Sequence, residues 1–112
     1  MLININDKYL YPQEAGLSFQ TVEEARIIVF KEPIPNKVMT GHVIRRESVP
    51  NEGSCRVKCY MEPNCMSINM GPLTGGKMKC ELNNATAENE FVFDLRTKDA
   101  HTYLAIEVSV FV

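Results

Sequence analysis

The four cysteines of this 112-residue chain all lie within residues 54–84, and they constrain the fold more than any other feature. Cys55 and Cys59 are four residues apart, a spacing that places both thiols on one face of a helix. Ser54 is a suitable N-cap, and Pro63 pushes the residue before it out of the helical region. A helix of about nine residues is therefore predicted, and it needs a packing partner because it is too short to be stable alone in water.

A β-hairpin is predicted directly after this helix. From Cys65 onward, apolar and polar residues alternate on both sides of a turn that contains Pro72, Thr74 and three glycines. The apolar positions are Met66, Ile68, Met70, Met78, Cys80 and Leu82, and the polar positions are Ser67, Asn69, Lys77, Lys79 and Glu81. One cysteine thus faces inward from each piece of the segment.

The segments before the helix are predicted to be strands. Residues 2–11 are typical of an edge strand or an extended arm. Residues 21–31 combine helix-favouring side chains with a β-branched run, and a strand is favoured from about Arg26. Residues 38–46 are predicted to form a further strand.

The segments after the hairpin complete the predicted sheet. Residues 85–90 are polar and are expected to form a surface loop, residues 90–93 a short strand or extended segment, and residues 94–101 a charged, solvated stretch. Residues 102–112 are apolar on both faces, which indicates a central strand covered by the helix on one side and by a second layer on the other. The sum is one helix and about six strands. We therefore expect a single α+β domain over residues 1–112, with a mainly antiparallel sheet that cradles one short α-helix.

Thiols can form disulfides, bind zinc or act as nucleophiles. Zinc sites favour paired short spacings, whereas the four cysteines here are separated by three, five and fourteen residues. Disulfides are the favoured interpretation, and they would place the protein in an oxidising compartment. A small intracellular zinc-binding domain is the alternative.

Further motifs extend the pattern beyond the cysteines. They are the Cys-x3-Cys-x5-Cys spacing from residue 55, a Ser-x-Asn strand at 67–69, a glycine-containing hairpin, Cys-Glu-Leu-Asn at 80–83 and Gly-His-Val-Ile at 41–44. Over residues 38–84 this pattern resembles the centre of a PAN/apple domain, an extracellular adhesion module.

The resemblance implies a curved antiparallel sheet cradling one helix, with disulfides Cys55–Cys80 and Cys59–Cys65. Apple domains proper carry a third bridge that joins the two ends of the module, so this chain resembles the shorter two-bridge versions. The implied function is non-enzymatic: an extracellular binding or adhesion module, part of a larger multidomain protein, that recognises carbohydrate or protein ligands through a surface made rigid by disulfides. A structural spacer in an extracellular matrix protein is the alternative.

The residues give no support for catalysis, a cofactor or a metal site. His42 is expected in a strand and His101 in a loop, and neither has a spacing that suggests a triad or a metal pair. Residues 74–77, Thr-Gly-Gly-Lys, lack the complete phosphate-loop pattern and are expected to form the hairpin turn. We therefore predict that the protein is not an enzyme.

Charge is segregated along the chain. The net charge is −2, which argues against a nucleic-acid partner, yet residues 45–80 hold six basic and three acidic side chains. The six basic residues are candidates for a patch that binds a sulfated glycan or an acidic protein face; they are Arg45, Arg46, Arg56, Lys58, Lys77 and Lys79. The alternative is a solvated outer face that balances the acids elsewhere.

Two further features concern the setting of the protein. No stretch approaches the roughly 20 apolar residues that span a bilayer, so no membrane insertion is expected. Asn84 begins an Asn-Ala-Thr glycosylation sequon where a loop is predicted. A glycan there would exclude that loop as a close docking surface.

Overall fold

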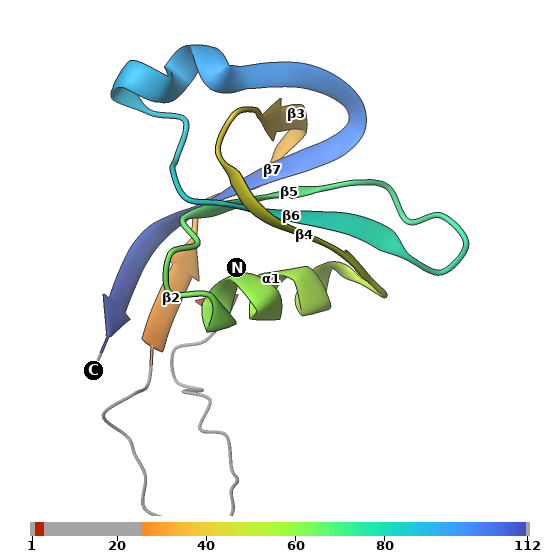
Figure 1. The fold of residues 1–112 in the computed structure, drawn as a ribbon, viewed down its shortest axis with the longest axis horizontal. Coiled ribbons are helices and arrows are strands. Elements are labelled where there is room, and N and C mark those ends of the chain that lie inside the picture. Colours follow the sequence, from red (N-terminus) through yellow and green to blue (C-terminus); the bar gives the residue numbers. More distant parts are fainter. Residues whose placement is uncertain (1, 4–25, 112) are drawn as a thin grey trace, which may run out of the picture.

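An antiparallel sheet forms most of the computed structural model, which describes residues 2–3 and 26–111 (Figure 1). Within these residues the strands are β1 Leu2–Ile3, β2 Arg26–Phe30, β3 Ile34–Met39, β4 Val43–Val49, β5 Ser67–Met70, β6 Met78–Asn83 and β7 Leu95–Phe111, and the helices are α1 Glu52–Met61 and the 3-10 helix η3 Asn89–Asp94. The strand order is β1-β2-β7-β5-β6-β4, with β3 also paired to β7, and every pairing is antiparallel. The predicted α+β class, a mainly antiparallel sheet with one short α-helix, is confirmed.

The N-cap of the α-helix lies three residues before the predicted one. The N-cap is Asn51, whose side-chain oxygen accepts a hydrogen bond from the Ser54 N–H at 2.8 Å. Asparagine caps a helix as well as serine does, and it takes the position that satisfies a free N–H of the first turn. The predicted end is confirmed, because Glu62, the residue before Pro63, has an extended backbone and follows the last helical residue.

Two disulfides hold α1 against one face of the sheet. The helix–sheet disulfide joins Cys55 to Cys80 on β6, and the helix–loop disulfide joins Cys59 to Cys65 just before β5. These are the pairs that the resemblance implies. Because all four sulfurs are buried and bonded, no thiolate is available to bind zinc, and the zinc alternative is contradicted.

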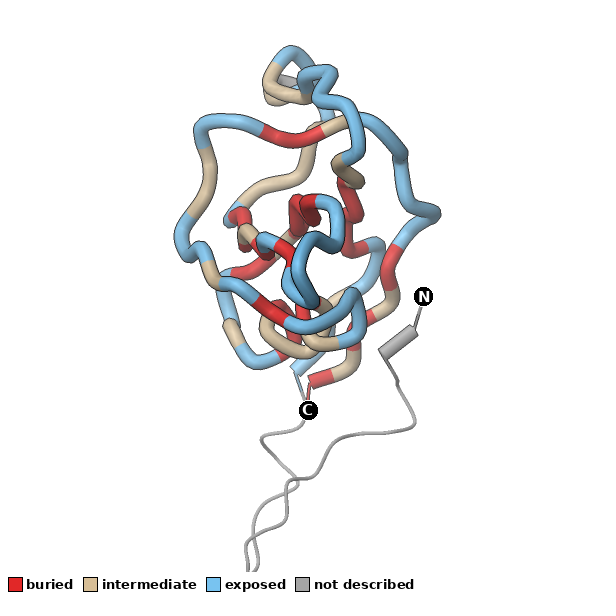
Figure 2. The backbone as a smooth tube through the Cα atoms, turned by 90° about the vertical axis from the view of Figure 1, so that its right-hand side faces the viewer, coloured by how far each residue is buried: buried red, intermediate tan, exposed pale blue. Residues whose placement is uncertain are grey.

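Hydrophobic side chains fill both faces of the central strands. The larger core lies between α1 and the sheet and includes Ile28, Phe30, Ile68, Met70, Leu82, Leu104 and Ile106. A smaller core on the opposite face gathers Met39, Tyr103 and Ala105, with Ala85, Ala87, Phe91 and Leu95 packed against it. In Figure 2 many of the buried positions lie in the middle of the molecule. The predicted burial of the last strand on both faces therefore holds for residues 103–106, whereas residues 107–111 are partly or fully exposed.

The polar positions that alternate with apolar ones in β5 are not exposed. All four residues of this strand are buried, because the smaller core covers the face on which Ser67 and Asn69 lie. Their polar groups are paired within the protein: the Ser67 hydroxyl donates to the Ala85 carbonyl oxygen at 2.6 Å, and the Asn69 amide bonds the backbone of Met39. Burial therefore leaves both polar side chains hydrogen-bonded, as buried polar groups require.

Three predicted element boundaries also change. Residues 38–46 are not one strand, because Gly41 has a positive φ of 85° and turns the chain between β3 and β4. Residues 90–93 belong to η3 and not to a strand. Residues 95–101 are exposed for the most part, as predicted, but they form the first part of β7 because they lie beside β3.

Other predictions on the flanks hold where the structure describes them. The strand expected from about Arg26 is β2, and the edge position expected for residues 2–11 is seen for β1 at the end of the sheet order. Residues 4–11 lie outside the described residues. Over residues 2–3 and 26–111, no helix is long and apolar enough to cross a membrane.

Candidate functional site

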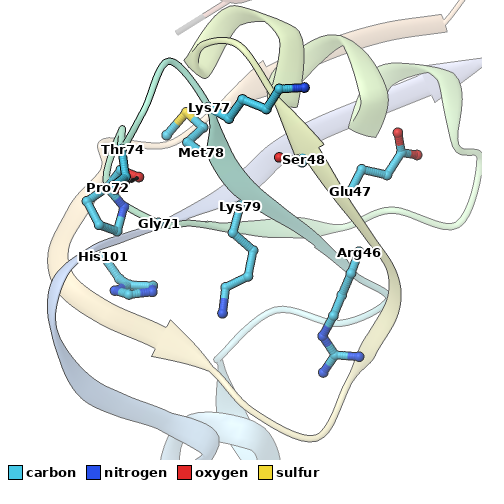
Figure 3. Close-up of a pocket in the computed structure, with 10 residues that line it drawn as sticks. All are labelled: Arg46, Glu47, Ser48, Gly71, Pro72, Thr74, Lys77, Met78, Lys79 and His101. Atoms are coloured by element: carbon cyan, nitrogen blue, oxygen red, sulfur yellow. Dashed lines mark hydrogen bonds between the residues drawn. The ribbon is translucent and has the colours of Figure 1, made fainter.

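A pocket of about 630 Å³ opens beside β4 and β6, next to the part of β7 that contains His101 (Figure 3). Its lining comes from residues 46–48 of β4, from Gly71, Pro72 and Thr74 in the β5–β6 connection, from residues 77–79 at the start of β6, and from His101 of β7. Pockets that hold small ligands typically have volumes of about 300–1,000 Å³. The volume of the pocket therefore fits a small molecule, or one or two monomer units of a larger polymeric ligand.

The turn that closes one side of the pocket is the one predicted from sequence. Thr74 and Lys77 form a backbone bridge, and the two glycines between them have φ values of 61° and 80°. A two-residue loop with positive φ at both positions is a type I′ turn, which glycine favours. The local sequence thus determines where β6 begins, with Lys77 just before the strand and Lys79 within it.

The register of β4 and β6 divides the predicted basic patch. Arg46 lies opposite Glu81 and Ser48 opposite Lys79, so these side chains share the face that bears the pocket. Arg45 lies opposite Leu82 and points to the other face, which α1 covers. Alternation along β4 therefore sends two neighbouring arginines to opposite sides.

The structure brings Arg46, Lys77 and Lys79 to the pocket and keeps the other three candidates on the helix side. There Arg45 lies 3.6 Å from Glu47, Lys58 lies 3.0 Å from Glu47, and Arg56 lies 3.5 Å from Glu52. The six candidates thus do not form one patch.

Within the pocket the basic side chains are arranged on two sides. His101, Lys79 and Arg46 lie in a row along one side, whereas the Lys77 ammonium extends the opposite way at the rim near Met78 (Figure 3). The row brings two cationic side chains and one imidazole ring together.

Glu81 positions two members of this row. Its carboxylate lies 3.0 Å from Arg46 Nε and 3.8 Å from Lys79 Nζ, and its other oxygen accepts a hydrogen bond from Asn69 Nδ2 at 3.0 Å. Burial opposes ionisation of Glu81, but the hydrogen bonds from Asn69 and Arg46 and the charges of Lys79 and Arg46 outweigh it and hold the pKa of Glu81 below its usual value. The carboxylate is therefore ionised at neutral pH and orients both cations.

Asn69 in turn fastens Glu81 to β3. Its side-chain amide accepts from the Met39 N–H and donates to the Met39 carbonyl, both at 2.8 Å. A side-chain amide that pairs with both groups of one backbone unit imitates a neighbouring strand. Asn69 is therefore a positioning residue beneath the pocket, whereas the sequence predicted only a polar position in a strand.

A bulge in β7 brings His101 to the pocket. Between two ladder positions β3 advances two residues, from Pro35 to Lys37, while β7 advances five, from Thr97 to Thr102. The extra length is held by Ala100, whose φ is 64° and whose N–H donates to the Asn36 side-chain oxygen at 3.0 Å. Non-glycine residues rarely adopt positive φ, so the bulge is a locally strained segment next to the pocket.

His101 lies over the floor of the pocket at Gly71. A Cβ atom at position 71 would lie 3.5 Å from His101 Nε2 and 3.4 Å from Lys79 Cβ, so a side chain there would contact both residues. His101 was predicted to be a loop residue and is instead in the bulged part of β7. No glycine marks the bulge, which is why the sequence did not reveal it.

The second histidine lies in a different part of the fold. His42 precedes β4 and is not in a strand; its Nε2 lies 2.8 Å from Asp94 Oδ2, and its ring lies 4.6 Å from the ring of Phe91. These contacts join η3 to the β3–β4 turn. In the described part of the chain, no group of three or more histidine, cysteine or acidic side chains could hold a metal ion.

The sequon asparagine is exposed just beyond the end of β6. The Asn84 N–H donates to the His42 carbonyl at 3.0 Å, and the side chain is open to solvent. Residues 74–77 lie at the other end of β6, so Asn84 and the turn beside the pocket are at opposite ends of this strand.

Comparison with known proteins gives one match. A family model described as "PAN domain" matches residues 31–106, a range that includes both disulfides and every residue that lines the pocket. No curated protein and no solved structure gives a significant match.

Proposed function

Because the chain belongs to the PAN domain family, we propose that it is a non-enzymatic, extracellular binding module that takes a carbohydrate or protein ligand in the pocket between β4, β6 and β7. PAN domains are disulfide-rich modules that often mediate protein or carbohydrate binding, are generally non-catalytic and are typically parts of larger proteins. On this proposal residues 1–112 form one such module within a multidomain adhesion protein.

The observation that carries the proposal is the location of the pocket on a part of the sheet that the disulfides hold in place. The helix–sheet disulfide joins β6 directly to α1, and the helix–loop disulfide fixes the chain that leads into β5. A surface that is already ordered loses little conformational entropy when a ligand binds. Disulfides of this kind persist in oxidising compartments, which supports an extracellular location.

A steric block of the pocket tests this proposal without assuming a ligand. Ser48 is exposed on β4 and lines the pocket, so Ser48→Trp fills the pocket without changing its charge. Val108 is exposed on β7 at the opposite end of the sheet, and Val108→Trp serves as the matched control. The three proteins are applied to an array of glycans and to an array of extracellular proteins.

We expect ligands of the wild-type protein to be lost with Ser48→Trp and kept with Val108→Trp. A wild-type protein with no ligand on either array would favour the structural spacer and refute the proposal. Ligands that survive Ser48→Trp would place the binding site on another surface.

We further propose that Asn84 carries an N-linked glycan when the protein is secreted from a eukaryotic cell. The support is the exposure of Asn84 and the position of its sequon after the end of β6. Intact mass before and after enzymatic removal of N-glycans should differ for the wild type and not for Asn84→Gln. Equal masses for the wild type would refute this.

A further inference from the structure

Resting on the proposed binding function, we infer that the pocket recognises an acidic saccharide. Its acidic group, a sulfate ester or a carboxylate, lies between Lys79 and Arg46, and a neighbouring hydroxyl of the sugar meets His101. This assigns the ligand class and gives each of the three residues in the row a role (Figure 3).

The first support is a surplus of positive charge at the pocket. Arg46 and Lys79 share a single carboxylate, that of Glu81, and both cationic side chains are well exposed. Lys77 makes no ion pair within residues 26–111. The remaining acid at the pocket, Glu47, is paired with Lys58 and Arg45 on the helix side. An anion that enters the pocket is therefore attracted and meets donors that are already oriented.

The second support is the hydrogen-bonding state of His101. Its Nδ1 lies 3.0 Å from the carbonyl oxygen of Asp99, and a carbonyl oxygen can only accept a hydrogen bond. In the neutral ring Nδ1 therefore carries the proton and Nε2 is an acceptor beside Gly71. Lysine and arginine side chains only donate. A ligand that satisfies the row thus needs an acidic acceptor next to a hydroxyl donor, a combination that acidic sugars carry and that the side chains of glutamate and aspartate lack.

The third support distinguishes a saccharide from an acidic peptide. At the floor of the pocket the backbone groups are already paired: the Gly71 N–H donates to Lys79 at 3.0 Å, and Thr74 and Lys77 bond each other at 2.8 and 3.1 Å. A peptide that adds a strand to a sheet needs free backbone groups on an edge. The unpaired edge of the sheet here is the outer side of β4, away from β6. Recognition at the floor is therefore left to side chains, which suits a compact ligand rich in polar groups.

Binding measurements with four probes test the inference. The probes are a heparin tetrasaccharide, the same tetrasaccharide after complete removal of its sulfates and acetylation of the amines that this exposes, a neutral tetrasaccharide, and a polyglutamate peptide of the same charge as the first. The desulfated probe keeps its carboxylates, so the first two probes distinguish sulfate from carboxylate recognition. Titration calorimetry at low and moderate salt gives the affinities, which should weaken with salt for an ionic site.

Matched variants locate the site. Arg46→Gln with Lys79→Gln removes two charges from the row, and Arg45→Gln with Lys58→Gln removes the same charge from the helix side. We expect the first pair to weaken binding of the acidic saccharide by about tenfold or more and the control pair by less than about twofold. His101→Ala should weaken binding of the acidic saccharide and leave any residual binding of polyglutamate unchanged. Unfolding midpoints close to that of the wild type show that the variants are folded.

The outcomes separate this inference from the proposed function. Binding of polyglutamate as strong as that of the acidic saccharide, or equal losses in both pairs of variants, would overturn the inference. If Ser48→Trp abolishes binding to the array ligands and the wild type binds neither acidic saccharide, the inference is overturned while the proposed function stands. A protein that binds none of the probes and no array ligand would refute both.

Discussion

The attachment of α1 to the edge of the sheet should depend more on the buried side chain of Arg26 than on any other side chain. Arg26 is nearly fully buried and donates hydrogen bonds to the carbonyl oxygens of Cys59 at 2.7 Å, Tyr60 at 3.0 Å, Glu62 at 2.8 Å and Cys65 at 2.9 Å. Nε also donates to Ser109 on β7 at 3.1 Å. Arg26 thus satisfies the C-terminal end of α1 and joins it to β2 and β7.

The substitution Arg26→Met keeps most of the apolar stem and removes the donors. Five hydrogen bonds are lost, and at about 1 kcal/mol net for each they would total about 5 kcal/mol. Burial disfavours the charged form and lowers the pKa of Arg26, although Tyr60 and Glu62 oppose this, so removing the charge recovers part of the loss. We therefore expect the free energy of unfolding to fall by about 3 kcal/mol.

Urea unfolding followed by circular dichroism, with the disulfides intact, measures this change. A loss of about 3 kcal/mol corresponds to a decrease in Tm of about 12 °C for a domain of this size. Arg96→Met, at an exposed position of β7, is the control and should change the stability by less than about 0.5 kcal/mol. If Arg26→Met were as stable as Arg96→Met, the argument that Arg26 holds the end of α1 would be wrong.

Three further predictions concern the disulfides and the support of the pocket. Replacing Cys55 and Cys80 with alanine opens a loop of 25 residues, against 6 for the helix–loop disulfide. The chain-entropy contribution lost is therefore about 3.5 kcal/mol for the first pair and about 2.2 kcal/mol for the second. Denaturant unfolding of each double variant measures the loss, and equal losses would contradict this. Asn69→Ala leaves the Met39 backbone without its buried partner and should cost about 2–3 kcal/mol and speed amide exchange at Met39; unchanged exchange would count against the positioning role. Glu81 has a folded-state pKa below the ordinary value, so its contribution is complete above the unfolded pKa of about 4.3 and is lost as pH falls through the folded pKa. The stability difference between wild type and Glu81→Gln should therefore be constant above about pH 5 and shrink on acidification, and a difference that grows in acid would refute this sign.

The helix and hairpin could be predicted because their signals are local. The helix ends where Pro63 requires it, and the turn after Thr74 forms where two successive glycines permit positive φ. The N-cap was misplaced by three residues because Asn51 and Ser54 are both good caps and only the packed structure selects between them.

The features that escaped prediction depend on contacts between distant residues. The bulge at Ala100 arises from the pairing of β3 with β7, which the local sequence does not encode. The break between β3 and β4 is different, because it lies at Gly41, a local signal that the prediction of one strand passed over. The burial of Arg26 could have been predicted from the sequence, because Arg26 alternates in phase with Ile28 and Phe30, the other buried positions of β2. A charged residue on the apolar face of a strand indicates a buried, fully hydrogen-bonded group.

The candidate site was predicted in part for the same reason. The sequence singled out Arg46, Lys77 and Lys79, which line the pocket, but it could not separate them from Arg45 because that division depends on the register of β4. His101 reaches the pocket only through the bulge.

Mapping the binding site by nuclear magnetic resonance tests the central claim most directly. In a titration of the ¹⁵N-labelled protein with its best ligand from the arrays, the amide resonances of Arg46, Gly71, Lys79 and His101 should shift most, because these residues surround the pocket. The face that bears Lys58 should be nearly unaffected, since it lies on the helix side of the sheet. Largest shifts on that face, or at residues 107–111, would show that the ligand binds elsewhere and would contradict the account.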